Sequence, residues 1–163
     1  MKKHQWILFL FTVFLVCSCQ KKSDMEKEKE AIKSVIEAEL KASFYGDYES
    51  WKDFFAHEPN TFCFHSDRGN CNSWVGWEEI RTEAKNFIRP ERTAGRIYEG
   101  YYDYSVRICE ESALATFKTK MIVIQISDTY DCEITGTEMR VLEKQDGQWK
   151  ITYLGTVYSI DNE

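Results

Sequence analysis

The sequence lacks several features that would point to particular classes of protein. It holds two prolines against five tryptophans, nine tyrosines and ten phenylalanines, a balance that favours a folded body over a disordered tail. It contains no internal repeat and no low-complexity block. It also has no Ser-His-Asp arrangement, phosphate-binding loop or dinucleotide fingerprint, which argues against the hydrolases and nucleotide-binding proteins that use them.

Basic residues are scarce, which bears on the partners to expect. Residues 19–163 carry 19 lysines and arginines against 27 acidic residues, a formal charge of −8. This charge repels nucleic acid and anionic lipid head groups, so we expect neither as a partner. The 145 residues of this segment suit one domain and can bury about two-thirds of their unfolded surface.

The longest apolar run is too short to cross a bilayer as a helix. It covers residues 6–16, broken only by Thr12, and follows Lys2 and Lys3, as the core of a signal peptide does. It ends in Leu15-Val16-Cys17-Ser18-Cys19, which resembles the bacterial lipobox. The resemblance implies cleavage before Cys19 and attachment of lipid, including an acyl chain such as palmitate, to Cys19. The alternatives are an ordinary signal peptide or a signal anchor.

These features predict three segments and a location. We expect a lipoprotein signal peptide over residues 1–18, a charged tether over residues 19–27 and one domain over residues 28–163. The protein would then sit in the bacterial cell envelope, periplasmic or surface-exposed, with the lipid on Cys19 as its contact with the membrane.

The remaining cysteines leave alternatives open. Cys63 and Cys71 flank a turn-rich stretch that could close a hairpin, so they could form a disulfide or stay as free thiols. Together with His65 they could also supply three soft metal ligands, but no CxxC or HxxxH pair supplies a fourth, and we predict no metal site. Cys109 and Cys132 are expected at opposite ends of one long strand and not to pair.

The first half of the domain has helical periodicity. Apolar residues recur at helical spacing from residue 28 to Phe44, and Gly46 ends the pattern. Asp47 is a good N-cap for a second, short helix. Residues 61–65 read as a strand, and a third helix begins at Gly76 and is closed by Pro90.

The second half alternates as strands do. Residues 102–108 form one strand, and residues 113–127 form another in which a shift of apolar parity predicts a bulge near Met121. Residues 133–143 and 149–159 form a hairpin around Asp146-Gly147. The order predicts an α+β fold, with N-terminal helices packed on a strongly curved, mostly antiparallel sheet.

Three short motifs carry a family resemblance. Gly46-Asp47-Tyr48, the run from Val75 to Ile80, and the run from Asp146 to Ile151 are similar to those of the nuclear transport factor 2-like superfamily, in its SnoaL-like branch. The resemblance covers residues 28–160 and implies a cone-shaped fold with a pocket between the first helix and the inner face of the sheet. That fold hosts isomerases, cyclases, dehydratases and association domains, so it does not decide the function.

Glu39 is the candidate with the clearest chemical signal. It lies between Val35 and Ile36 on the helical wheel, inside the apolar stripe, where a lone carboxylate is costly to bury. In the implied pocket its pKa would be raised, as a general acid or base requires. The alternative is a place at an open rim, or a structural pair with Arg140 or another base.

The other candidates are weaker. His57 follows the second helix, where this fold often places the pocket mouth, and His65 ends a strand; both could relay protons or be ordinary loop residues. Phe64 stands where the related ketosteroid isomerase carries its aspartate base, and Tyr153 stands where many SnoaL-like chains carry histidine. The resemblance therefore favours a pocket for ligand binding, lined by Glu39, Phe55, Phe64, Tyr104, Phe117 and Tyr153.

Three hypotheses follow for the function. The first is an anchored lipoprotein that binds a small apolar or aromatic ligand without transforming it and without a cofactor. The second is an isomerase, cyclase or dehydratase with Glu39 as base, assisted by Tyr153 or His57. The third is an association module that forms a homodimer through the outer face of the sheet, as many members of the superfamily that this sequence resembles do.

Overall fold

The computed structural model describes residues 3–67, 70–93, 95–123 and 132–160. The chain divides into two compact units, residues 1–34 and residues 35–163. The helices are α1 (Lys3–Tyr45), α2 (Tyr48–Lys52), α3 (Trp77–Phe87) and α4 (Pro90–Thr93). The strands are β1 (Phe62–Asp67), β2 (Asn70–Val75), β3 (Arg96–Cys109), β4 (Ser112–Val123), β5 (Cys132–Gln145) and β6 (Gln148–Ile160).

The first unit consists, where it is described, of the N-terminal part of α1. We predicted a helix only from residue 28, and the structure continues it back to Lys3. One exposed i,i+3 ion pair, Lys27 with Asp24, lies on this added stretch, and another, Lys29 with Glu26, spans its end. Among the residues described with side chains, no helix is long and apolar enough to cross a membrane.

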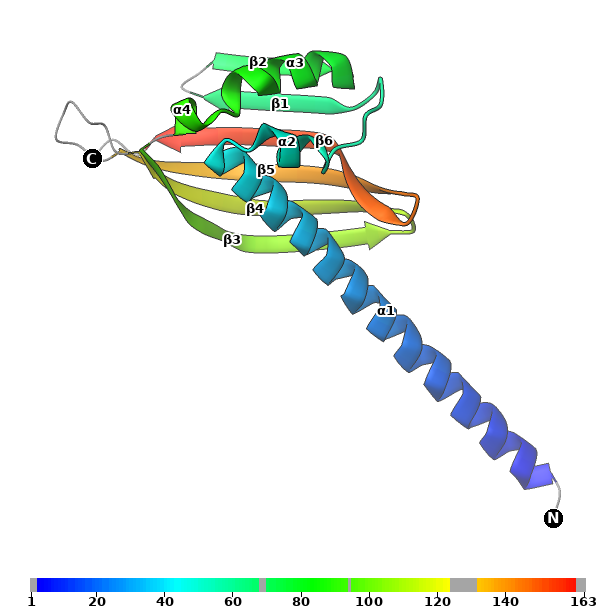
Figure 1. Cartoon of the computed structure of the whole chain (residues 1–163). Coiled ribbons are helices and arrows are strands. Elements are labelled where there is room, and N and C mark those ends of the chain that lie inside the picture. The colour runs from blue at the N-terminus through cyan, green and yellow to red at the C-terminus, as the bar shows by residue number, and fades with distance from the viewer. Residues whose placement is uncertain (1–2, 68–69, 94, 124–131, 161–163) are drawn as a thin grey trace. The chain divides into compact units, whose positions relative to one another are not determined.

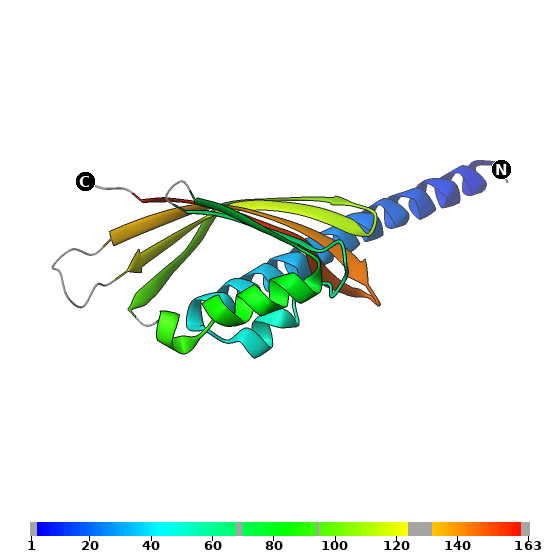
Figure 2. The ribbon, with the colours of Figure 1, turned by 90° about the horizontal axis from the view of Figure 1, so that it is seen from above.

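The second unit is built on one six-stranded sheet in the order β2-β1-β6-β5-β4-β3 (Figure 1). Only the β1–β6 pair is parallel, and all other neighbours are antiparallel. Figure 2 shows α2, α3 and the C-terminal part of α1 on the same side of this curved sheet. This is the predicted α+β architecture, and the covered side is called the inner face below.

Local sequence signals explain the ends of the helices and the last turn. Gly46 has φ 74°, and a Cβ there would lie 2.5 Å from the backbone of Arg89, so glycine is required. Asp47 caps α2 by accepting a hydrogen bond from the Ser50 backbone N–H at 3.0 Å. Asp146 and Gly147 both have positive φ, as a two-residue hairpin turn between β5 and β6 requires.

The hydrophobic core lies between the helices and the inner face. Buried residues repeat at helical spacing on the helices and at every second position on the strands. Its main members in this unit are Ile36, Leu40, Phe44, Trp51, Phe55, Trp77, Ile80, Ala115, Phe117, Leu142, Trp149 and Ile151. The core therefore fixes which strand residues face the helices.

The predicted irregularity near Met121 is present, but it lies on the neighbouring strand. The register of β4 against β5 runs without a break from Ser112 to Val123. In the β3–β4 pair one register shift follows Tyr98, which pairs with Met121, and another follows Tyr102. Residues 124–127 of the predicted strand lie outside the described residues.

Pro90 follows the end of the third helix, as predicted, and also begins the next one. The helix α3 ends at Phe87, and Pro90 is the first residue of the short helix α4. This first position suits proline, because its missing N–H has no partner within a helix there and its fixed φ is already helical.

Candidate functional site

A cavity of about 580 Å³ lies between the helices and the inner face of the second unit. Its volume is within the usual range of small-molecule sites. Its most buried part is the charged floor, which consists of Glu39 from α1 and of Glu138 and Arg140 from β5, each at most 2 % exposed. These positions alternate along β5, so both strand residues face the same helix.

The cavity changes character from the charged floor to its opening. Apolar side chains form the apolar wall: Leu40, Phe44, Ile80, Ala84, Ile88 and Met121. Exposed residues form the rim: Asn70, Asn72, Phe87, Arg92 and Arg96. A molecule in this space would meet polar groups at both ends and hydrocarbon between them.

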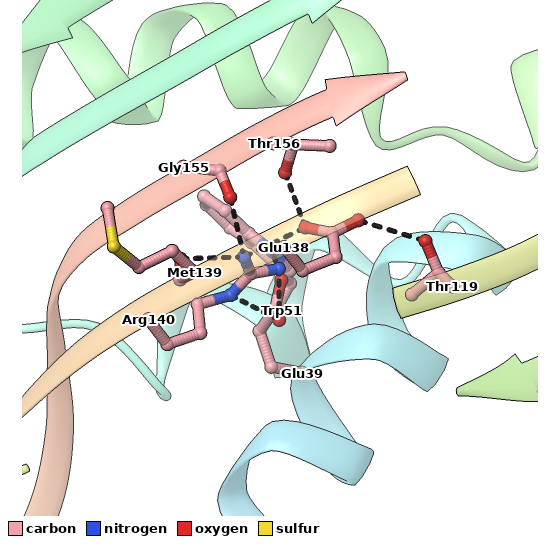
Figure 3. Close-up of polar contacts among 8 residues, drawn as sticks. All are labelled: Glu39, Trp51, Thr119, Glu138, Met139, Arg140, Gly155 and Thr156. Atoms are coloured by element: carbon pink, nitrogen blue, oxygen red, sulfur yellow. Dashed lines mark hydrogen bonds and ion pairs between the residues drawn. The ribbon is translucent and has the colours of Figure 1, made fainter. Parts of the chain in front are cut away.

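Glu39 is held by hydrogen-bond donors only (Figure 3). Its Oε1 accepts a bond from the indole Nε1 of Trp51 at 2.9 Å. Its Oε2 accepts bonds from Nε and Nη2 of Arg140 at 3.2 and 3.1 Å. Because all of these partners donate, the geometry fits the ionised carboxylate.

Glu138 is held in the same way on the other side of the guanidinium. Its Oε1 accepts from the hydroxyl of Thr119 at 3.1 Å. Its Oε2 accepts from the hydroxyl of Thr156 at 2.6 Å and from Nη1 of Arg140 at 3.0 Å. The arrangement connects strands β4, β5 and β6 through one carboxylate, as Figure 3 shows.

Arg140 joins the two carboxylates and also binds the backbone. Its Nη1 donates to the carbonyl oxygens of Met139 at 3.1 Å and Gly155 at 3.5 Å. The guanidinium carbon lies 5.5 Å from the centre of the Phe117 ring, within the range of a cation–π contact. Arg140 therefore holds the two carboxylates and the backbone of β5 and β6 together at the floor.

Burial and charge act against each other on the pKa values of the floor. Burial raises the pKa of Glu39; the guanidinium of Arg140 opposes this rise, and Glu138 adds to it. Burial acts to lower the pKa of Arg140, but the two carboxylates outweigh burial and the pKa is raised. The guanidinium therefore keeps its charge, while Glu39 takes up a proton more readily than an ordinary glutamate.

His65 reaches the cavity, whereas His57 does not. His65 lies on β1 and packs edge-on against Tyr158 at 5.2 Å, and burial lowers its pKa, so it is neutral at pH 7. His57 is exposed, stacks on Trp77 at 4.0 Å and has its Nε2 3.0 Å from the carbonyl oxygen of Lys52. His57 therefore packs at the end of α2 and does not line the pocket.

Of the predicted pocket residues, only Glu39 and Phe64 line the cavity. Phe55 belongs to the core and lies 4.1 Å from the Trp51 ring. Tyr104 and Phe117 pack against Tyr101 on strands β3 and β4, and the Phe117 ring also contacts the guanidinium of Arg140. Tyr153 alternates with the inward-facing Leu154 and stacks on Phe62 at 5.1 Å, because a register shift beside Val141 puts it on the outer face.

Of the alternatives left open for Cys63 and Cys71, the structure has the free thiols. Strand β1 pairs Cys63 with Trp74 and Ser66 with Cys71, so the two thiols lie on opposite faces of the hairpin and both are free. Cys63 is buried, and burial raises its pKa to about 12, so it stays a neutral thiol. Among the described residues no group of three or more His, Cys, Asp or Glu could hold a metal ion.

Sequence reasoning missed Glu138 and named Arg140 only as an alternative partner. A signal was present: the two charged residues occupy alternate positions of a strand, between Gly136 and the apolar Leu142. Opposite charges at the inward positions of a strand indicate a buried pair. What was missing was the knowledge of which face of the strand turns inward.

The comparisons with known proteins concern the fold. No protein-family model and no curated protein matches the sequence. The solved structure of a nuclear transport factor 2-like superfamily protein from Salmonella enterica is similar over 85 % of this chain and 94 % of that chain, with 22 % identity and a TM-score of 0.65.

Two structures from Novosphingobium aromaticivorans are also similar. An NTF2-like protein with a cystatin-like fold has 11 % identity and a TM-score of 0.68, over 89 % of this chain and 90 % of that chain. A proposed scytalone dehydratase has 16 % identity and a TM-score of 0.67, over 85 % of this chain and 88 % of that chain. At these identities the likeness concerns the fold alone. The chain therefore has the nuclear transport factor 2-like fold that its short motifs predicted.

Proposed function

We propose that this protein is a bacterial envelope lipoprotein, anchored through lipid on Cys19, whose folded domain binds a small and partly apolar molecule without transforming it. The observation that carries the binding role is the cavity of about 580 Å³, with an apolar wall above a buried charged floor. The lipobox-like residues before Cys19 support the anchor.

The way in which the polar groups are engaged supports binding without turnover. The indole of Trp51 and the guanidinium of Arg140 both donate to Glu39, and both act to lower its pKa, which weakens it as a base. The thiol of Cys63 is protonated, so it is a poor nucleophile.

One observation favours an enzyme as the second candidate. Burial raises the pKa of Glu39, and a raised pKa is what a carboxylic general acid or base needs near neutral pH. One similar structure is named as a proposed scytalone dehydratase. In this alternative Glu39 would exchange a proton with a substrate in the cavity, and neutral His65 would lie within the same space.

Native mass spectrometry of the full chain, released from detergent, tests the binding role. We expect an adduct of a small molecule retained from the host, and the adduct should be lost in Ala84→Phe, which fills the apolar wall. An adduct retained in that variant would contradict the assignment of the cavity. Release of a chemically changed molecule during incubation would favour the enzyme, and the same spectra report whether the chain forms a homodimer.

Metabolic labelling with palmitate tests the anchor. Cys19→Ala should lose the label and leave the membrane fraction, while Cys71→Ala should keep both, because Cys71 lies in the folded domain. Label retained on Cys19→Ala at the unmodified level would contradict the lipoprotein assignment.

A further inference from the structure

We propose that the ligand is a small organic cation, an amine whose protonated nitrogen lies at the charged floor and whose apolar body lies along the apolar wall. This inference rests on the proposed function of the cavity as a ligand site and names the chemical class of that ligand. It is carried by the charge of the floor, by the hydrogen-bonding capacity left on it and by the lining above it.

The floor carries an excess of negative charge. Glu39 and Glu138 share one guanidinium, that of Arg140, so the ionised floor has a formal charge of −1. The other charges that line the cavity balance, since it is also lined by two acidic residues, Asp67 and Glu83, and two basic residues, Arg92 and Arg96. A buried charge without a partner is costly, so a cation at the floor would remove a penalty that an empty cavity retains.

The hydrogen bonds of the charged floor also favour a positively charged ligand. A carboxylate offers about four acceptor positions. The bonds to Glu39 occupy three of them, as do the bonds to Glu138, and on each residue Oε1 holds a single bond. The floor therefore offers a ligand acceptors, which match an ammonium group.

An anionic head group on the ligand is disfavoured at the charged floor. The guanidinium of Arg140 is committed to the two carboxylates and to the carbonyl oxygens of Met139 and Gly155. A ligand carboxylate would lie against the two like charges of Glu39 and Glu138. The floor thus selects against acids as well as for amines.

The lining above the floor fits an apolar body. The wall is made of aliphatic and aromatic side chains, and the rings of Trp74 and Phe87 lie 6.4 Å apart at the opening. The guanidinium of Arg92 already lies 5.4 Å from the centre of the Phe87 ring, which shows that this opening accommodates a cation against an aromatic face. A ring or a short branched chain would therefore contact the apolar wall and these aromatic rings.

Cation binding is linked to the protonation of Glu39. An ammonium group at the floor favours the ionised carboxylate and so lowers the raised pKa of Glu39. By the same linkage, the cation binds more weakly as the pH falls and Glu39 takes up its proton. The affinity for a neutral ligand of the same shape would rise or stay constant as the pH falls.

Calorimetric titration of the full chain in a nonionic detergent, with benzylamine, benzyl alcohol and benzoate as matched probes, tests the ligand class. We expect benzylamine to bind about tenfold or more tightly than benzyl alcohol at pH 7.5, and benzoate to bind weakest. Glu138→Gln should weaken benzylamine about tenfold, whereas Glu143→Gln, an exposed residue of the same strand, should leave its affinity within about twofold.

The outcomes separate this inference from the proposed function. Saturable binding of benzyl alcohol or benzoate as tight as that of benzylamine, lost in Ala84→Phe, would overturn the cation and keep the ligand site. Failure of all three probes, with no retained adduct in native spectra, would overturn both. If Glu138→Gln does not fold, the pH dependence of binding to the unaltered chain decides. An affinity for benzylamine that rises as the pH falls from 7.5 would overturn the assignment of a cation as the ligand.

Discussion

Replacement of Arg140 by methionine tests the charged floor most severely. The side chain is 2 % exposed and pairs with Glu39 at 3.1 Å and with Glu138 at 3.0 Å. Removal of one member of a buried ion pair costs about 3–5 kcal/mol, because the other member is left buried without a partner. Here two carboxylates would be left, so we expect Arg140→Met to lower the free energy of unfolding by about 3–5 kcal/mol at pH 7.

Urea unfolding followed by tryptophan fluorescence measures this loss, since Trp51 lies at the floor. Arg107→Met is the matched control, because Arg107 is exposed on β3, and it should change the free energy of unfolding by at most about 0.5 kcal/mol. The deficit of Arg140→Met should shrink as the pH falls toward 5 and Glu39, whose pKa is raised, takes up a proton.

A double-mutant cycle adds a second check. Arg140→Met combined with Glu39→Gln should cost less than the sum of the two single variants, with a coupling of about 1–3 kcal/mol. A loss below about 1 kcal/mol for Arg140→Met alone would refute the reasoning, because ion pairs of that strength are typical of exposed surfaces.

Three further predictions concern single residues. Because the folded state raises the pKa of Glu39 above its unfolded value near 4.5, protonation stabilises the fold, so unaltered protein should gain stability relative to Glu39→Gln as the pH falls from 7 toward 4.5. Urea titrations at a series of pH values measure this gain. A difference in the free energy of unfolding that stays constant with pH would contradict the raised pKa. At pH 8, a maleimide should modify exposed Cys71 well before buried Cys63, as peptide mass mapping can show. Gly46→Ala should cost about 1–3 kcal/mol in urea unfolding, because its φ of 74° and the backbone of Arg89 at 2.5 Å exclude a Cβ.

Features set by local chemistry could be predicted from the sequence. Gly46-Asp47 ends one helix and caps the next, and Asp146-Gly147 forms the predicted hairpin turn. The helical period placed Glu39 on the buried side of α1, where the structure has it. These signals act within a few residues, so they need no knowledge of the rest of the chain.

Features set by strand register could not be predicted. A shift of one residue turns every side chain of a strand to its other face. The choice between a disulfide and free thiols stayed open for this reason, because only the pairing of Cys63 with Trp74 shows that Cys71 lies on the other side. Glu138 joins the site for the same reason, through the register of β5 between β4 and β6. Tyr153 was misplaced because a register shift lies beside it.

The indole N–H signal of Trp51 tests the central claim, that a cation binds at the charged floor of the cavity, most directly. This N–H donates to Glu39 at 2.9 Å, and Trp74 lies at the same cavity, whereas Trp149 does not line it. In a ¹H–¹⁵N correlation spectrum of the full chain, addition of benzylamine should move the Trp51 and Trp74 signals saturably and leave Trp149 in place. A Trp51 signal that stays fixed while benzylamine binds, or that moves equally with benzoate, would contradict the account.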